Sequence, residues 1–239
     1  MKEIKEIIIG DYQYLVIGVS VIGKKKTENQ DSFLLSSDKA SLTITVADGL
    51  GSAPFSREGA IKICNLCQNM LLSNVDNNAI LELKEKWKES VKSDFDKYDT
   101  TIKFLKISGN EVLFGGVGDG WICLSSGKDT VSLEAPHTFS NQTDSILSID
   151  LLSKFSVKRV SITGEFVGLV STDGFSEDID KKNATEFLNE IKTNASNDIN
   201  GFAEEMENSL KNWPVETNCD DKTVVFIVRK EISKWTIYS

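Results

Sequence analysis

Residues 43–52 of the chain read TITVADGLGS, an apolar run that ends in an acid followed by small residues. The alternation of Ile44 and Val46 with threonine is typical of a β-strand, which Asp48 and Gly49 would end. One explanation is a turn, because glycine accepts a positive φ and aspartate caps tight turns. The other is that Asp48 binds something at the end of the strand.

Apolar runs of this kind recur along the chain. A group of predicted strands is followed by a group of predicted helices, and this order occurs twice. Strands are predicted at residues 12–22, 41–47, 101–107, 111–118, 120–126, 129–134, 155–162, 166–171, 223–229 and 231–238. Helices are predicted at about 56–74, 78–96, 183–193 and 198–211. This order does not match the strict alternation of a doubly wound sheet. It predicts an α+β fold of two mostly antiparallel sheets packed face to face, with helix pairs outside.

The size of the chain suits one domain. Its 239 residues, 40% of them hydrophobic, can bury a full core, so we expect a single domain over residues 1–239. Residues 136–154 have only weak periodicity, which predicts a short loop or flap over one edge of the sheets.

Acidic residues stand at the ends of the predicted strands. Asp-Gly occurs three times after an apolar run, at Asp48, Asp119 and Asp173. Two further acidic positions flank strand-like runs, with Asp31 ahead of residues 33–35 and Asp220 ahead of residues 223–229. Each Asp-Gly pair alone is more often a turn than a ligand. Together, these acids could converge at one end of a sandwich.

Carboxylates gathered in one place repel one another and stay partly protonated, and divalent cations remove that cost. Carboxylate and carbonyl oxygens suit hard ions such as magnesium and manganese. A glycine after the aspartate would let its carbonyl approach the metal, because no Cβ intervenes. The pattern therefore predicts a metal site formed by several strand ends.

Six stretches, in this order and spacing, resemble the metal-dependent type 2C (PPM) serine/threonine protein phosphatases, and in particular the compact bacterial branch. They are GKKKTENQDSF (23–33), TVADGLGSAPFSREGA (45–60), YDTTIKFL (98–105), GVGDGWICL (116–124), VSTDGFSE (170–177) and DDKTVVFIV (220–228). The resemblance covers about residues 15–229. It implies a four-layer α-β-β-α sandwich, which agrees with the element order above.

The resemblance also implies roles for single residues. Asp48 would bridge two Mn²⁺ or Mg²⁺ ions, with the Gly49 carbonyl on one of them, and Asp173 and Asp220 would complete the other. Two ions about 3.5–4 Å apart can share a water molecule and lower its pKa to near neutral. The resulting hydroxide would attack the phosphorus of a phosphoserine or phosphothreonine, so no serine or cysteine nucleophile is needed.

Three further acids receive supporting roles from the same resemblance. Asp31 would lie in the first ligand shell or just behind it. Asp119 matches the acid that holds a third, weaker metal ion in related bacterial enzymes. Asp221 stands where the family usually has asparagine, and it would orient Asp220 or the turn.

The chain departs from the family pattern at two positions. Lys26 stands where the family has an arginine that grips the phosphate, and lysine is a flexible point charge without the bidentate fork of arginine. Lys26 can replace that arginine, Lys24 or Lys25 can, or the three form a solvated turn. Leu50 stands where many eukaryotic members have a histidine that acts as a general acid. The only histidine of the chain, His137, falls in the expected flap, where it is either a proton donor or an exposed loop residue.

Two other functions remain open at this level. A catalytically weak or silent relative could keep the fold as a regulatory or binding module, and Lys26 favours that reading. A phosphohydrolase with an aspartate nucleophile would need an Asp-x-Asp pair after its first strand, but ADGLG offers one acid. The three acids Asp48, Asp173 and Asp220 favour the metal-dependent phosphatase.

Charge and hydropathy limit the partners. The 36 acidic against 27 basic residues argue against a nucleic-acid or anionic-membrane surface. No stretch reaches 18 uninterrupted apolar residues, and Glu3 and Glu6 stand where a signal sequence would be basic. We expect a cytoplasmic monomer. The resemblance implies a phosphoprotein substrate and a cognate protein kinase.

Overall fold

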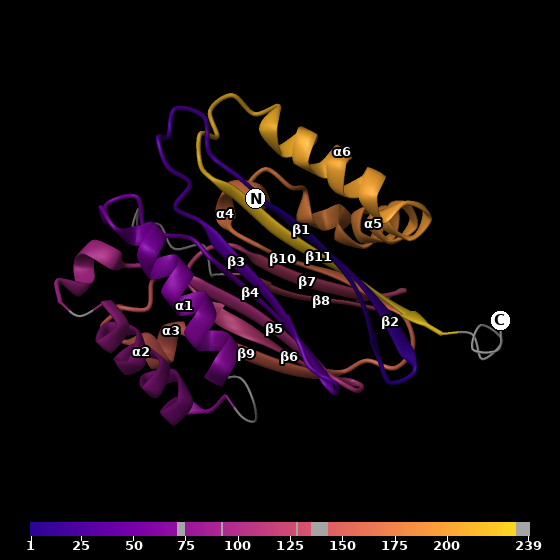
Figure 1. Ribbon diagram of the computed structural model, residues 1–239, viewed down its shortest axis with the longest axis horizontal. Helices are drawn as coiled ribbons and strands as arrows, with labels where there is room; N and C mark the ends of the chain where they lie inside the picture. The colour runs from indigo at the N-terminus through magenta and orange to yellow at the C-terminus, as the bar shows by residue number, and fades with distance from the viewer. Residues whose placement is uncertain (71–74, 92, 128, 135–142, 233–239) are drawn as a thin grey trace.

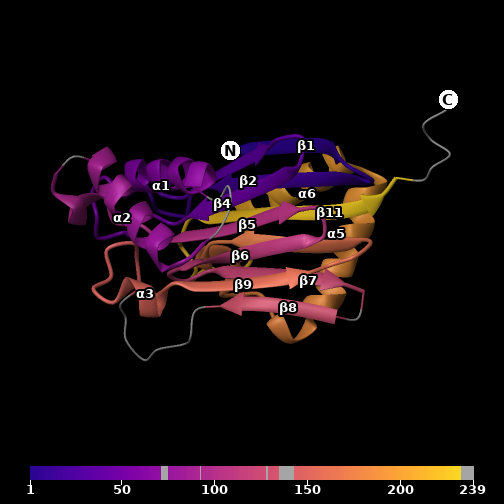
Figure 2. The same ribbon diagram turned by 90° about the horizontal axis from the view of Figure 1, so that it is seen from below.

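Two antiparallel β-sheets lie face to face, and a pair of helices covers the outer surface of each, as Figures 1 and 2 show. The structure is a computed structural model that describes residues 1–70, 75–91, 93–127, 129–134 and 143–232. The predicted α-β-β-α sandwich is therefore confirmed. Among the described residues, no helix combines the length and the apolar character needed to cross a membrane.

One sheet has six strands in the order β1-β2-β11-β10-β7-β8. Their bounds are β1 Lys2–Ile9, β2 Tyr12–Val21, β7 Trp121–Ser126, β8 Asp129–Glu134, β10 Phe166–Ser171 and β11 Lys222–Glu231. The other sheet has five strands in the order β3-β4-β5-β6-β9. Their bounds are β3 Ser32–Ser37, β4 Ser41–Ala47, β5 Ile102–Ser108, β6 Glu111–Val117 and β9 Ser156–Ser161.

Four long helices form the outer layers. Helices α1 (Ser56–Met70) and α2 (Asn77–Val91) cover the five-stranded sheet, and α5 (Ala184–Asn197) and α6 (Ile199–Lys211) cover the six-stranded one (Figure 1). Short helical turns are α3 (Leu151–Lys154), α4 (Asp173–Ser176), η1 (Phe95–Tyr98) and η2 (Lys181–Asn183). The four long helices agree with the predicted ones, although α2 ends earlier than expected. Asp94, which follows it, has φ 55 and cannot continue a right-handed helix.

Successive side chains of each strand face opposite layers, because a strand has a period of two. In β5, for example, Leu105 and Ile107 lie in the core between the sheets. Ile102 and Phe104 lie in the core beneath α1 and α2. The same alternation in the other buried strands places one apolar core between the sheets and one under each helix pair.

Three strand assignments differ from those predicted. Strand β1 was missed, because it is an edge strand with mostly half-exposed residues and its apolar pattern is weak. Strand β3 was seen only as a short run at residues 33–35. The two predicted C-terminal strands are instead one continuous strand as far as Glu231, since β2 provides pairing partners up to Tyr12. Residues 233–238 of the second predicted strand lie outside the described residues.

The expected flap lies only partly within the described chain. Residues 136–142, and with them His137, are outside it. The described remainder packs against the segment before β5, since the backbone N–H of Ile146 donates to the Thr100 carbonyl at 3.0 Å.

Candidate metal centre

The core between the sheets ends in polar residues at one end of the sandwich. In each strand that contributes to this end, a polar residue lies two positions from a buried apolar residue. Its side chain therefore points to the same side of the sheet as that apolar residue. These polar residues, each paired with its apolar neighbour, are Asp31 with Phe33, Asp48 with Val46, Lys103 with Leu105, Thr172 with Val170, and Thr223 with Val225. Strand pairing therefore brings charged groups from both sheets together at one place. In the sequence, these groups are far apart.

Asp31 is one of two buried acids at this end, with an exposed fraction of 7% against 2% for Asp221. Its Oδ2 accepts a hydrogen bond from Thr172 Oγ1 at 2.9 Å. Its Oδ1 is buried and has no hydrogen-bond partner among the described residues. Burial raises the pKa of Asp31 to about 7, and the nearby charge of Asp221 adds to that shift. An unsatisfied oxygen of this kind fits a cation or a water molecule bound to one.

The backbone of Asp48 is fixed on both sides by the start of β5. Its carbonyl accepts hydrogen bonds from Thr101 N at 2.8 Å and Thr100 Oγ1 at 2.9 Å. Its N–H donates to Thr101 Oγ1 at 2.9 Å. Burial raises the pKa of the Asp48 carboxyl well above its usual value, and the charges of Asp31 and Asp173 raise it further. The carboxyl is thus held among other acids at a position where ionisation is costly.

Asp173 is the first residue of α4, directly after β10. Its Oδ1 accepts a hydrogen bond from Gly174 N at 2.7 Å. Its pKa is raised by burial first, and then by the charges of Asp220 and Asp119. Asp119 lies between β6 and β7 and accepts a hydrogen bond from Thr143 Oγ1 at 2.9 Å. The Asp173 carboxyl is therefore affected by the charges of both Asp119 and Asp220.

Two of the glycines after these acids are needed for space. A Cβ on Gly49 would lie 2.7 Å from the backbone carbon of Ser56, at the start of α1. A Cβ on Gly174 would lie 2.0 Å from the carbonyl oxygen of Asp221. Neither glycine has a positive φ. The pairs are therefore not hairpin turns of the positive-φ kind; their glycines let a second segment pass close by.

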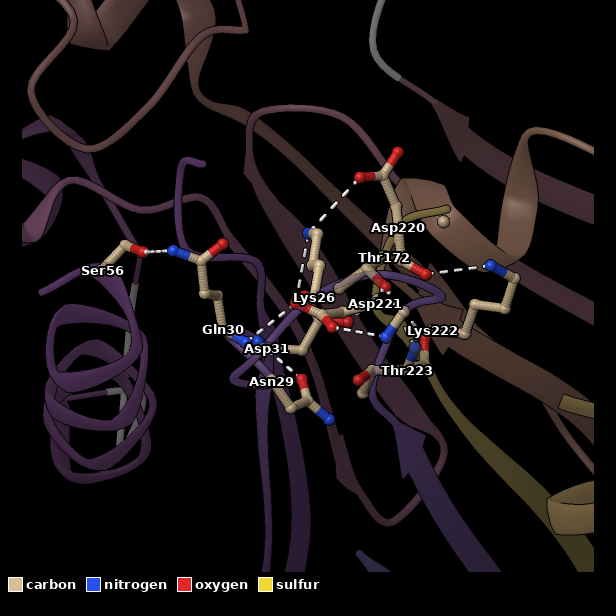
Figure 3. A network of polar contacts seen from close by, with 12 residues as sticks. Lys26, Asn29, Gln30, Asp31, Ser56, Thr172, Asp220, Asp221, Lys222 and Thr223 are labelled. Atoms are coloured by element: carbon tan, nitrogen blue, oxygen red, sulfur yellow. Dashed lines mark hydrogen bonds and ion pairs between the residues drawn. The ribbon is translucent and has the colours of Figure 1, made fainter. Parts of the chain in front are cut away.

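Lys26 lies between Asp220 and Asp221, as Figure 3 shows. Its Nζ is 3.3 Å from Asp220 Oδ1 and 3.2 Å from Asp221 Oδ2. Burial alone would lower the pKa of Lys26, but the charges of Asp221 and Asp220 outweigh it and raise the pKa. The Asp220 side chain is 58% exposed, so this acid is the one with most freedom to turn.

Asp221 is buried and fastens the loop that carries Lys26. Its Oδ1 accepts the N–H of Gly23 at 2.8 Å, and its Oδ2 accepts the N–H of Gln30 at 2.8 Å. The loop between β2 and β3 is therefore tied to the start of β11, and Figure 1 shows the two segments side by side. The resemblance implies that Asp221 orients Asp220 or the turn, and that role stays a prediction; the contacts described here orient the loop that carries Lys26.

Lys103 is a charged residue of this end that the sequence analysis did not single out. It is 3% exposed, and its Nζ donates to the Gly118 carbonyl at 2.6 Å. Burial lowers the pKa of Lys103 to about 8, while the charges of Asp119 and Asp173 oppose that shift. A signal was present in TTIKFLKIS, where Lys103 occupies an inward position of an otherwise apolar alternation.

The donors of this end fit a divalent cation by their chemistry. They are carboxylates that are buried (Asp31) or half-buried (Asp48 and Asp173), mutually repelling and, at Asp31, incompletely hydrogen-bonded. They are not drawn together around one point, however. Among the described residues, no three His, Cys, Asp or Glu side chains lie close enough together to enclose an ion.

Every acid named from the sequence thus lies at this end, and so does Lys26. Asp48 interacts electrostatically with Asp31 and Asp173, and Asp173 with Asp119 and Asp220. Their assignment as metal ligands, and that of the Gly49 carbonyl, stays a prediction.

The comparisons of this chain with known protein families and with solved structures agree with one another. The family model described as protein phosphatase 2C matches residues 17–213. No curated protein matches the chain. The structure of RsbX in complex with magnesium has a TM-score of 0.66 and 19% identity, and the match covers 96% of this chain and 100% of that one.

Two further solved structures are similar. The serine/threonine phosphatase of S. agalactiae has a TM-score of 0.62 and 18% identity, with 90% of this chain and 98% of that chain covered. The catalytic domain of the serine/threonine phosphatase PstP, in complex with two manganese ions, has a TM-score of 0.62 and 13% identity, with 92% and 100% covered. At such identities these likenesses show the fold alone.

Proposed function

Because the chain belongs to the protein phosphatase 2C family, we propose that it is a metal-dependent phosphoprotein phosphatase acting on phosphoserine and phosphothreonine. The observation that carries this proposal is the collection of Asp31, Asp48 and Asp173 at one end of the sandwich. The pKa of each is raised by burial. Ionised acids in such places make the folded chain less stable, and a bound cation offsets that cost.

In this proposal, Asp48, the Gly49 carbonyl, Asp173 and Asp220 would hold the Mn²⁺ or Mg²⁺ ions. Asp31 lies in the first shell or behind it. When bound, the ions lower the pKa of a water molecule and offset charge on the phosphoryl oxygens. RsbX with magnesium and PstP with two manganese ions support the choice of metals.

Asp119 would hold a third, weaker ion. The charge of Asp119 acts on Asp173, so an ion at Asp119 would be affected by the same acids as the other two ions. Its hydrogen bond from Thr143 limits the directions in which its carboxylate can turn.

Lys26 is proposed to bind the phosphate of the substrate. Its loop is fixed by Asp221, and its Nζ stands at the acidic end within 3.3 Å of Asp220. If Asp220 turns toward a cation, Lys26 loses one of its two carboxylate partners and its charge becomes available to an anion. Lysine provides a point charge here and no bidentate fork, so the grip on phosphate is weaker than that of arginine.

A hollow beside the acids offers room for a protein substrate. It has a volume of about 520 Å³ and begins at Leu50, two residues after Asp48, with Asp99, Thr143 and Ile149 among its lining residues. Ile149 is 99% exposed. A segment of polypeptide on either side of a phosphorylated residue could lie there. This supports a phosphoprotein as the substrate, which a protein kinase would phosphorylate.

The test is Mn²⁺-dependent hydrolysis of p-nitrophenyl phosphate and of a phosphoserine peptide by the purified chain. Asp173→Asn should lower kcat at least about a hundredfold, because it removes charge where the ions would bind. Asp129→Asn, an exposed acid at the start of β8, should leave activity unchanged and serves as the matched control.

One observation favours the silent module as a second candidate. Lys26 already pairs with Asp220 and Asp221, and no three acids of the described chain enclose an ion. Mn²⁺ binding without turnover of either substrate would support that function and end the enzymatic proposal.

A further inference from the structure

Lys103 is a buried cation to which the proposed function gives no role. It is held in the middle of the five-stranded sheet, where its backbone pairs with Val46 of β4 and Gly116 of β6. Gly116 lets the two strand backbones approach here, since a Cβ there would lie 2.0 Å from the Ile102 carbonyl oxygen and 2.9 Å from the Lys103 Cα. Lys103 has an exposed fraction of 3%, so the residue is almost fully removed from solvent.

The ammonium group is near two acids but bonded to neither. Its hydrogen-bond acceptor is the carbonyl of Gly118, the residue before Asp119, at 2.6 Å. No carboxylate of the described chain lies within ion-pair distance of it, yet the charges of Asp119 and Asp173 both act on it. The carboxylates therefore remain free to bind another cation, which would approach the ammonium group.

We propose that Lys103 is a positioning residue that supplies a fixed positive charge beside Asp119 and so weakens divalent-ion binding at that acid. An ammonium group repels a dication twice as strongly as it attracts one carboxylate at the same distance. A third ion at Asp119 is thus disfavoured by a residue of this chain. This inference rests on the proposed function, because it presumes the ion positions assigned above.

The experiment is a Mn²⁺ binding isotherm of the purified full chain, by calorimetry and by the electron paramagnetic resonance signal of free Mn²⁺. Lys103→Met keeps the length of the buried stem and removes the charge. It should tighten the weakest Mn²⁺ site at least about tenfold or add one bound ion per chain. Lys106→Met, on the other face of the same strand, should leave the isotherm unchanged.

The double variant Lys103→Met with Asp119→Asn should lose the gain, because the acid that benefits is gone. Circular dichroism checks that each variant is folded, and Lys103→Gln replaces the methionine variant if that one is not. An unchanged or weaker isotherm in the folded variant overturns the role of Lys103 alone. Absence of Mn²⁺ binding in every variant, including the unaltered chain, overturns the proposed function as well.

Discussion

At the scale of single residues, Asp31 combines burial, one good hydrogen bond and one orphaned oxygen. Its neighbours satisfy Oδ2 through Thr172 and leave Oδ1 without a partner in the described chain. A residue arranged in this way makes the folded chain less stable when it is ionised alone. It is suited to a cation that arrives after folding.

The pH dependence of stability follows from this residue. The pKa of Asp31 rises from 3.8 to about 7 on folding, chiefly through burial. The folded state therefore keeps a proton that the unfolded state has lost, and the free energy of unfolding of the metal-free chain should fall as the pH rises across that window. One pKa unit corresponds to about 1.4 kcal/mol, so the fall amounts to a few kcal/mol at most.

Urea unfolding in EDTA at several pH values between those two pKa values measures this fall. Asp31→Asn should reduce it without abolishing it, since burial also raises the pKa of Asp48 and Asp173. The exposed Asp129→Asn variant should show the full decrease. A stability that increases with pH across this window would contradict the assignment.

At the scale of elements, helix α1 meets η1 and α2 at one glycine. A Cβ on Gly59 would lie 1.8 Å from the carbonyl oxygen of Tyr98, and the Gly59 carbonyl accepts the indole N–H of Trp87 at 3.1 Å. Helix α1 begins just after Asp48 and Gly49, so this contact also fixes the strand-to-helix connection at the acidic end.

Gly59→Ala should therefore destabilise the chain, although alanine is the better helix former. The steric cost of about 1–3 kcal/mol exceeds the gain in helix propensity of at most about 1 kcal/mol. Thermal and urea unfolding measure the difference, with Asn69→Ala on the exposed side of the same helix as the control. Equal or greater stability of the Gly59 variant would mean that the three elements separate easily.

The elements were predictable to different degrees for physical reasons. The long helices and the buried strands have strong periodicity, so their types follow from sequence pattern. Strand β1 does not, because an edge strand is half solvated and its stability comes from pairing with β2. The Asp-Gly pairs were recognised, but glycine is needed at these positions because of tertiary contacts, with Ser56 at Gly49 and with the distant Asp221 at Gly174, which no Asp-Gly pattern contains.

At the scale of the whole molecule, the acids come from both sheets. Asp31 and Asp48 flank strands of the five-stranded sheet, and Asp173 and Asp220 flank strands of the six-stranded one. A cation bound by both sets would join the two halves of the sandwich. The sequence predicted the set of acids and their gathering at one end of the sandwich, but which acids interact depends on which strands pair and in which register. Lys103 was missed although its inward position in the strand pattern was visible, because its nearness to these acids also depends on that pairing.

Mn²⁺ should therefore stabilise the folded chain as a whole. At a hundredfold excess over its dissociation constant, one bound ion adds about 2.7 kcal/mol, which corresponds to a rise in Tm of roughly 5–10 °C for a chain of this size. Differential scanning calorimetry with Mn²⁺ and then with EDTA measures the shift. A Tm that does not respond to Mn²⁺ would mean that no cation joins the sheets.

The close approaches at Gly49 and Gly174 also divide the molecule into two ends with different tolerance to change. At Gly49 and Gly174 of the acidic end, neighbouring segments touch backbone to backbone, so one residue inserted beside either glycine would push a neighbour aside. At the opposite end, the turns at Gly10, Gly109 and Gly127 have nothing within 4 Å of where a side chain would begin. Variation in chain length, whether from evolution or from an engineered tag, can accumulate at that end without disturbing the acids.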